Sequence, residues 1–210
     1  LATLTAAGNG YNIKTDAGVT TGATIVGSRG TDFITGSKFA DTITGGEGAD
    51  TITAGAGNDT INLLESVSAV DTIRINTIAE STTSANVKTI SNFVSGVDKI
   101  NFAQGALSLT GVTTDGTSAV SAMSAAVANT TTVNSIADVY TALATYTTLT
   151  ASAADGSATI AQAYTFANGT AAGTYVVVND ATAGFQAATD VVIHLTGTTT
   201  IAAGDFTFDV

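Results

Sequence analysis

The chain has 210 residues, with 17 acidic and 6 basic side chains, a formal net charge of −11, and no cysteine or proline. This acidic balance argues against nucleic acid and anionic membrane surfaces as partners, because both attract basic patches. The absence of cysteine excludes a disulfide framework, and no run of 18 apolar residues predicts a membrane-inserted helix. The chain opens on Leu1-Ala2-Thr3 without a signal-peptide pattern, so we expect a fragment of a longer protein.

A nine-residue repeat spans residues 27–62 and reads GSRGTDFIT, GSKFADTIT, GGEGADTIT and AGAGNDTIN. Position six is aspartate and position eight is isoleucine in every unit (Asp32, Asp41, Asp50, Asp59; Ile34, Ile43, Ile52, Ile61). The Gly-rich first half of a unit predicts a tight turn. The alternation in Thr51-Ile52-Thr53 predicts a short strand with the isoleucine on one face.

This period brings like charges together. Two units make one full coil, and successive coils stack at roughly 4.8 Å. Asp32 then lies next to Asp50 on one side, and Asp41 lies next to Asp59 on the other. Two carboxylates about 5 Å apart repel by roughly 3 kcal/mol at an effective dielectric of 20, which favours a cation between them. Hard oxygen ligands on Gly-rich turns suit calcium; in the alternative, a plain β-helix, the aspartates only satisfy turn amides.

The pattern resembles the calcium-binding nonapeptide G-G-x-G-x-D-x-U-x of RTX proteins. The resemblance implies a parallel β-roll whose folding is coupled to binding of Ca2+. It implies ligands from the repeat aspartates and from the turns: Asp32, Asp41, Asp50, Asp59, Gly27, Gly30, Gly36, Gly45, Gly46, Gly48, Gly55, Gly57 and Asn58. Arg29, Lys38 and Phe39 depart from the pattern in the first two units, so we expect weaker calcium binding there. Residues 18–26 keep an isoleucine but have Ala23 in place of aspartate, as expected of an upstream coil without the acidic ligand.

The repeat fails after Asn62. Asp71-Thr72-Ile73 echoes it out of phase and without a preceding glycine, so we interpret residues 63–88 as a cap on the roll. The segment ISNFVSGVDKINF is similar to the segment that comes after the roll in RTX proteins, and we expect its apolar residues to be buried: Ile90, Phe93, Val97, Ile100 and Phe102. Asp98 is either another calcium ligand or a turn residue.

The fold class that we predict is mainly β: a parallel β-roll domain over residues 1–102, followed by a β-rich C-terminal domain over 103–210 with a short helical insertion at about 118–146. Two helices are predicted within the insertion, over Ser118–Ala128 and over Asn134–Tyr146, the second capped by its asparagine or the following serine. Because the second helix has no lysine or arginine, we expect it to pack on a sheet and not on a membrane surface.

The last third of the chain is predicted to be β again. Tyr164–Ala167 and Thr174–Asn179 flank a glycine-containing turn and predict a hairpin, and Asp190–Thr196 predicts another strand. The tail Gly204–Val210 alternates apolar and polar residues. It is a final edge strand, an export signal similar to those of type I secretion substrates, or both.

No catalytic motif is present. The sequence contains no H-E-x-x-H, no G-x-S-x-G and no G-x-x-x-x-G-K-[ST]. The one histidine, His194, lies in a predicted strand, where we expect a surface or partly buried polar residue. We therefore expect no enzymatic activity.

The resemblance implies the C-terminal part of a secreted bacterial protein that stays unfolded inside the cell, where calcium is scarce, and folds outside. Two functions are compatible with it. The first is a structural domain of a surface-layer protein or adhesin that self-associates into a lattice at the cell surface through calcium-dependent contacts. The alternative is an export and folding module for a larger parent chain, such as an RTX protease, lipase or haemolysin. The Thr/Ala/Gly-rich acidic composition and the lack of catalytic motifs favour the first.

Overall fold

The computed structural model describes residues 2–3, 10–15, 18–77, 80–81, 85–103, 127–145, 161–178, 184–197 and 200–208. The described chain is mainly β, which confirms the predicted fold class. Its strands are β1 Ala2–Thr3, β2 Asn12–Lys14, β3 Thr24–Val26, β4 Phe33–Thr35, β5 Thr42–Thr44, β6 Thr51–Thr53, β7 Thr60–Asn62, β8 Thr72–Ile75, β9 Lys88–Ser91, β10 Lys99–Phe102, β11 Val127–Thr132, β12 Ala161–Asn168, β13 Gly173–Val178, β14 Val191–Thr196 and β15 Phe206–Phe208. The helices are α1 Ile136–Leu143 and the short 3-10 turn η2 Ala203–Asp205.

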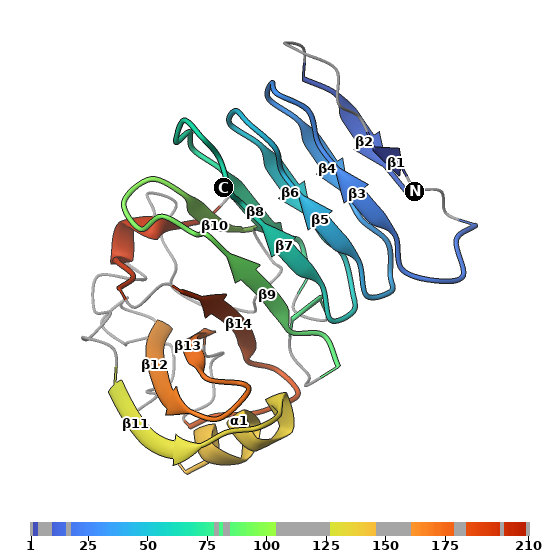
Figure 1. Ribbon diagram of the computed structural model, residues 1–210. Helices are drawn as coiled ribbons and strands as arrows, with labels where there is room; N and C mark the ends of the chain where they lie inside the picture. Colours follow the sequence, from blue (N-terminus) through green and yellow to red (C-terminus); the bar gives the residue numbers. More distant parts are fainter. Residues whose placement is uncertain are drawn as a thin grey trace.

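The repeats form a parallel roll of two facing sheets. One sheet has the order β1-β3-β5-β7-β9-β14-β13-β12-β11, and the other has the order β15-β10-β8-β6-β4-β2. From β1 to β10, consecutive strands therefore alternate between the sheets, and each strand pairs in parallel with the strand two places along the chain. The register aligns Ile25 with Ile43 and Ile61 in the first sheet, and Ile34 with Ile52 in the second. Figure 1 shows the resulting coils stacked in a row.

The core of the roll lies between the two sheets. In each three-residue strand the central isoleucine is buried, whereas the residues on either side are exposed or half-buried. This pattern follows from the two-residue period of a strand, which sends alternate side chains to opposite faces. The isoleucines of β4 to β7 share one apolar cluster with those of β8, β9 and β10.

The roll continues beyond the repeat, so our interpretation of residues 63–88 as a cap is wrong. β8 pairs with β6, with Ile73 beside Ile52, and β10 pairs with β8 in the same register. Only the Asp-Thr-Ile triplet is needed to build the strand; the turn before it can lengthen, because extra surface-loop residues add little closure entropy. Val97 is only half-buried, while the other apolar residues predicted for this segment are buried.

The C-terminal strands extend the sheets of the roll. β14 pairs in parallel with β9, and β13 and β12 follow it antiparallel, so the nine-stranded sheet runs without a break from the roll into the last third of the chain (Figure 1). The predicted hairpin and the strand over Asp190–Thr196 are thereby confirmed, except that Asn179 lies outside the described residues. β15 pairs with β10 as the edge strand of the second sheet; its possible role in export stays a prediction.

Helix α1 covers the face of the C-terminal sheet that points away from the roll. Ser135 caps it through a capping box with Asp138, as one of the two predicted caps. Its buried residues Val139, Tyr140 and Leu143 join a second apolar cluster with side chains of β12, β13 and β14. The first predicted helix lies outside the described residues up to position 126, and its last two residues, Val127 and Ala128, are strand instead.

Candidate calcium sites in the turns

Aspartates stack in a column on one side of the roll. The backbone N–H of Asp32 donates to Oδ1 of Asp50 at 2.8 Å, and the N–H of Asp50 donates to Oδ1 of Asp71 at 2.9 Å. The N–H of Asp71 in turn donates to Oδ1 of Asp98 at 3.1 Å. All of these carboxylates are buried. The structure thus brings together the predicted neighbours Asp32 and Asp50 and adds further acidic residues above them.

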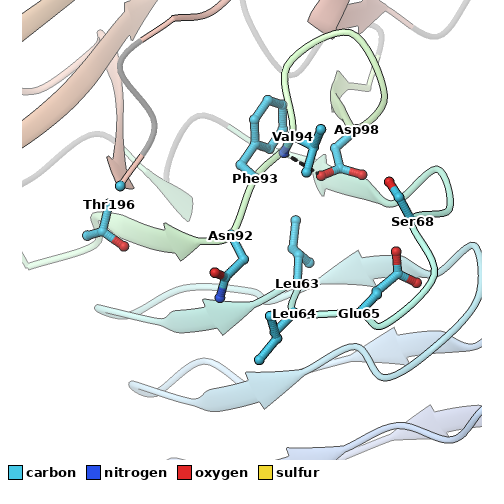
Figure 2. A pocket seen from close by; sticks show the side chains of 10 residues that line it. Leu63, Leu64, Glu65, Ser68, Asn92, Phe93, Val94, Asp98 and Thr196 are labelled. Carbon is cyan, nitrogen blue, oxygen red and sulfur yellow. Dashed lines mark hydrogen bonds between the residues drawn. The ribbon is translucent and has the colours of Figure 1, made fainter.

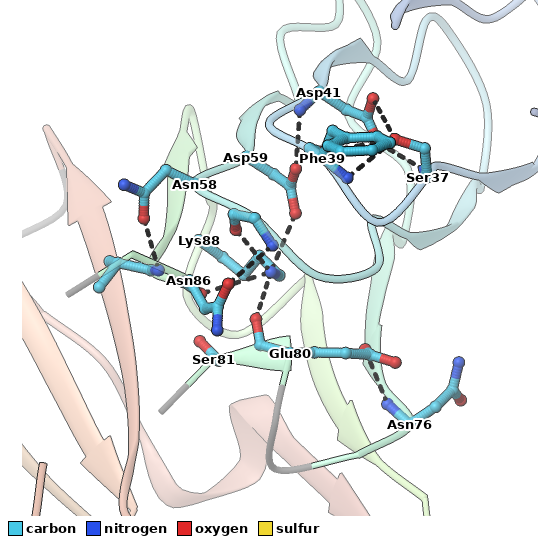
Figure 3. A network of polar contacts seen from close by, with 12 residues as sticks. Ser37, Phe39, Asp41, Asn58, Asp59, Asn76, Glu80, Ser81, Asn86 and Lys88 are labelled. Atoms are coloured by element: carbon cyan, nitrogen blue, oxygen red, sulfur yellow. Dashed lines mark hydrogen bonds and ion pairs between the residues drawn. The ribbon is translucent and has the colours of Figure 1, made fainter. Parts of the chain in front are cut away.

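The column on the other side ends differently. The N–H of Ala23 donates to Oδ1 of Asp41 at 2.6 Å, and the N–H of Asp41 donates to Oδ1 of Asp59 at 2.8 Å. Because Thr89 of β9 lies beside Thr60 of β7, the next position in this column is Lys88. Its Nζ lies 2.9 Å from Oδ2 of Asp59, and both side chains are buried (Figure 3).

Serine closes the turns of the first two repeats. The N–H of Ser28 donates to Oδ2 of Asp32 at 2.5 Å, and its hydroxyl donates to Oδ1 at 3.0 Å. Ser37 makes the same two contacts to Asp41, at 2.5 and 3.0 Å. The first of these turns spans Gly27 to Gly30, and the second begins at Gly36. In each turn, both carboxylate oxygens of the aspartate accept hydrogen bonds from the protein. In this structure these two aspartates therefore satisfy turn amides, as the plain β-helix alternative expects.

The turns of the third and fourth repeats are built from glycine. Gly46, Gly48, Gly55 and Gly57 all have φ between 90° and 113°, a conformation that other residues adopt only at a cost. A Cβ at Gly46 would lie 2.1 Å from the carbonyl oxygen of Ser28 in the neighbouring turn. Among the predicted turn ligands, Gly45 and Asn58 also lie in these turns. The backbone of these glycines lies close to the neighbouring turn. Backbone carbonyl groups and aspartate carboxylates are therefore near one another in these turns.

Buried carboxylate oxygens in these turns, and in the turn before β8, have no hydrogen-bond partner among the described residues. This holds for Oδ2 of Asp50 and of Asp71, and Oδ2 of Asp59 has only the ion pair with Lys88. A buried unpaired acceptor is costly, and a buried charge more so. Calcium takes oxygen ligands from carboxylates and backbone carbonyls, so these turns fit it. In the described part of the chain no three His, Cys, Asp or Glu side chains converge on one point, so backbone carbonyls would have to complete each ligand shell.

Asp71 precedes Thr72-Ile73 just as Asp41, Asp50 and Asp59 precede their Thr-Ile pairs, and this triplet was the available signal for its place in the column of aspartates. The wider turn before it also brings in Glu65, which accepts from the N–H of Gly48 at 2.8 Å and from that of Ala69 at 2.7 Å. Glu65 thus ties the turn before Asp71 to the turn before Asp50 and adds negative charge beside both.

Burial shifts the titration of these acids. The pKa of Asp50 is raised to about 7, chiefly by burial and also by the neighbouring charges of Asp32 and Glu65, against a backbone hydrogen bond that lowers it. Burial likewise raises the pKa of Asp71 to about 7. The pKa of Asp59 is raised by burial to about 6, although the Lys88 ammonium lowers it. Without a cation, the turns therefore hold carboxylates that resist ionisation.

An open pocket of about 270 Å³ lies between the turn that begins at Leu63 and the turn that holds Phe93 and Asp98 (Figure 2). Oδ2 of Asp98 accepts from the N–H of Val94 at 2.8 Å, while its Oδ1 accepts from Asp71. Of the two roles that we considered for Asp98, the described contacts are those of a turn residue.

His194 is 7% exposed, and its ring stacks on the ring of Tyr175 with 4.2 Å between the ring centroids. It is therefore more deeply buried than predicted.

Comparison with known proteins identifies the repeat. Residues 26–61 match the model of the RTX calcium-binding nonapeptide repeat in four copies. This segment is therefore an RTX β-roll. The chain is also similar to the AlgE6R3 subunit of the mannuronan C5-epimerase of Azotobacter vinelandii, known from a solution structure, at 17% identity and a TM-score of 0.48 over 90% of this chain and 80% of that one. No curated protein matches the chain. No described helix has the length and apolar character needed to cross a membrane.

The substitution Asp71→Asn tests whether the column of aspartates that contains Asp50 and Asp71 binds calcium. Asparagine keeps the acceptor for the N–H of Asp50 but replaces the unpaired Oδ2 with an amide, so we expect the rise in melting temperature on adding calcium to fall by at least half. Thermal unfolding in calcium and in EGTA measures the rise. Asp138→Asn removes the same charge at an exposed helix cap and should leave the rise unchanged. An unchanged rise in Asp71→Asn would exclude Asp71 as a ligand.

Proposed function

We propose that the chain is a calcium-dependent structural domain, without catalytic activity, of a secreted cell-surface protein of the surface-layer or adhesin type. Calcium entering the turns drives folding outside the cell and then assembly. The observation that carries this proposal is the pair of buried oxygens on Asp50 and Asp71 that have no hydrogen-bond partner among the described residues, within an RTX roll whose turns hold glycines with positive φ. Calcium is the cation whose ligand preferences fit that arrangement.

The surface of the roll supports the assembly step. Large apolar side chains are exposed along its turns and strands: Phe33, Leu64, Val67, Val70 and Val94. Val67 is 74% exposed and Leu64 is 63% exposed, and both lie in the wide turn between β7 and β8. Exposed apolar side chains that lie close together on a surface are typical of contacts with another molecule, and Leu64 and Val67 lie in one turn. A second copy of the chain is the partner that we propose, since an acidic surface loaded with calcium can lose its self-repulsion.

A second function is favoured by the position of β15. This strand forms the edge of the sheet whose strands β6 and β8 follow Asp50 and Asp71. Folding of the roll and ordering of β15 are therefore coupled through one sheet. Such coupling suits an export and folding module that serves a larger RTX enzyme or toxin.

Size-exclusion chromatography with light scattering, in calcium and in EGTA, separates the two functions. We expect EGTA to expand the chain and calcium to produce regular species of high mass. A compact monomer in calcium that expands in EGTA would favour the folding module instead. A radius and mass that calcium does not change would overturn both. Phe33→Ser and Val67→Ser, which remove exposed apolar groups, should reduce the high-mass species without preventing calcium-induced compaction.

A further inference from the structure

Lys88 stands where the repeat would place an aspartate. β9 continues the column of β5 and β7, with Thr89 beside Thr60 and Ile90 beside Ile61. The residue before Thr60 is Asp59, so the residue before Thr89 takes the same place one coil later. At this place the chain carries a lysine, and its side chain is 1% exposed. A buried lysine is rare unless its charge is paired.

The ammonium of Lys88 lies between two successive turns and contacts only oxygen among its described partners (Figure 3). From the turn before β7 it contacts Oδ2 of Asp59 at 2.9 Å and the carbonyl of Gly57 at 3.0 Å. From the turn before β9 it contacts the carbonyls of Glu80 and Asn86, the latter at 3.4 Å. One carboxylate and three backbone carbonyls, drawn from both turns, are the kind of ligands that calcium selects.

The column that holds Asp50 and Asp71, on the opposite side of the roll, can be compared with the column of Lys88. There the turns before β6 and β8 are likewise stacked, and Oδ2 of Asp50 and of Asp71 have neither a hydrogen bond nor a lysine. In the Lys88 column the equivalent oxygen of Asp59 faces a fixed positive charge. The asparagine Asn86 also reaches across, because its Oδ1 accepts from the N–H of Gly57 at 3.0 Å. The two turns are thus held against each other, and the carboxylate of Asp59 between them is paired with Lys88.

We propose that the ammonium of Lys88 replaces a calcium ion between the turn that holds Gly57 and the turn that holds Asn86. This inference rests on the proposed calcium-binding function of the roll. The replacement makes the contact between these two turns independent of metal. Because β9 also pairs with β14, the turn that holds Lys88 lies where the roll joins the C-terminal sheet. This contact can order first, and the calcium-dependent turns can then stack beside it.

Lys88→Met removes the charge and keeps the length of the side chain. In EGTA, the variant should melt about 10 °C lower than the unchanged chain, because an unpaired buried carboxylate remains. In saturating calcium, native mass spectrometry should find one more ion per chain than in the unchanged protein, and most of the lost melting temperature should return. Lys88→Asp, which restores the repeat aspartate, should also gain an ion and should depend on calcium still more strongly.

Lys99→Met is the matched control, since Lys99 donates to the carbonyl of Gly204 at an exposed site. It should bind as many ions as the unchanged chain. If the unchanged chain binds calcium but both Lys88 variants bind no additional ion, or stay unfolded in millimolar calcium, the replacement is wrong while the proposed function stands. If the unchanged chain binds no calcium, the proposed function fails and the inference fails with it.

Discussion

Acidifying the calcium-free chain from pH 8 to pH 5 is expected to raise its melting temperature by about 10 °C. Asp50 and Asp71 have their pKa raised to about 7, and Asp59 has its pKa raised to about 6, all chiefly by burial. In the unfolded chain each carboxyl returns to a pKa near 3.9. A raised folded pKa contributes stability at low pH, and this contribution is lost as the pH rises through 6 to 7.

Calcium reverses this dependence. An ion on the same oxygens requires ionised carboxylates, so protons and calcium compete for them. The melting temperature in saturating calcium should therefore fall on acidification while that in EGTA rises, and the two should converge near pH 5. Circular dichroism melts across this range give both curves. Asp50→Asn with Asp71→Asn should flatten the EGTA curve. A melting temperature in EGTA that falls steadily from pH 8 to pH 5 would contradict the burial of ionisable carboxyls.

The repeat carries enough information to place most of the roll. A period of nine residues puts every isoleucine at the same point of a strand, and two units close a coil, so the neighbours Asp32–Asp50 and Asp41–Asp59 follow from counting alone. The short helix was also readable, because its apolar spacing and its serine cap are local signals. In each of these cases the determining residues lie within two repeat lengths of one another.

The features that the sequence did not reveal depend on pairing over long distances. Asp71 joins its column across a turn of irregular length, which breaks the count although the strand register is kept. Lys88 meets Asp59 only because β9 stacks on β7 after a segment that breaks the nine-residue period. The pairing of β14 with β9 brings together residues about a hundred positions apart. No local propensity records such a contact, so the boundary that we predicted at residue 102 crosses two continuous sheets.

Replacing Gly55 with alanine is expected to destabilise the calcium-loaded chain by about 3 kcal/mol or more, because two separate penalties add. The φ of Gly55 is +90°, which costs a non-glycine residue about 1–2 kcal/mol. A Cβ would also lie 1.9 Å from the carbonyl oxygen of Ser37 in the neighbouring turn, so one turn must move away from the other. The proposed calcium ligands come from turns that are stacked on one another. Moving one of these turns away from the next should therefore also weaken calcium binding.

Gly96→Ala separates the two penalties. Gly96 has a φ of +86°, nearly the same as Gly55, but a Cβ there would meet nothing within 4 Å. This variant should lose only the conformational term, about 1 kcal/mol, and keep its calcium affinity. Urea unfolding in saturating calcium and calorimetric titration with calcium measure both quantities. If the two variants lose equal stability and both keep their affinity, then the glycines of the repeat are needed only for backbone conformation. A larger loss at Gly55, together with weaker binding, shows that the repeat uses glycine to let one turn lie against the next, where the ligands of two turns can reach the same ion.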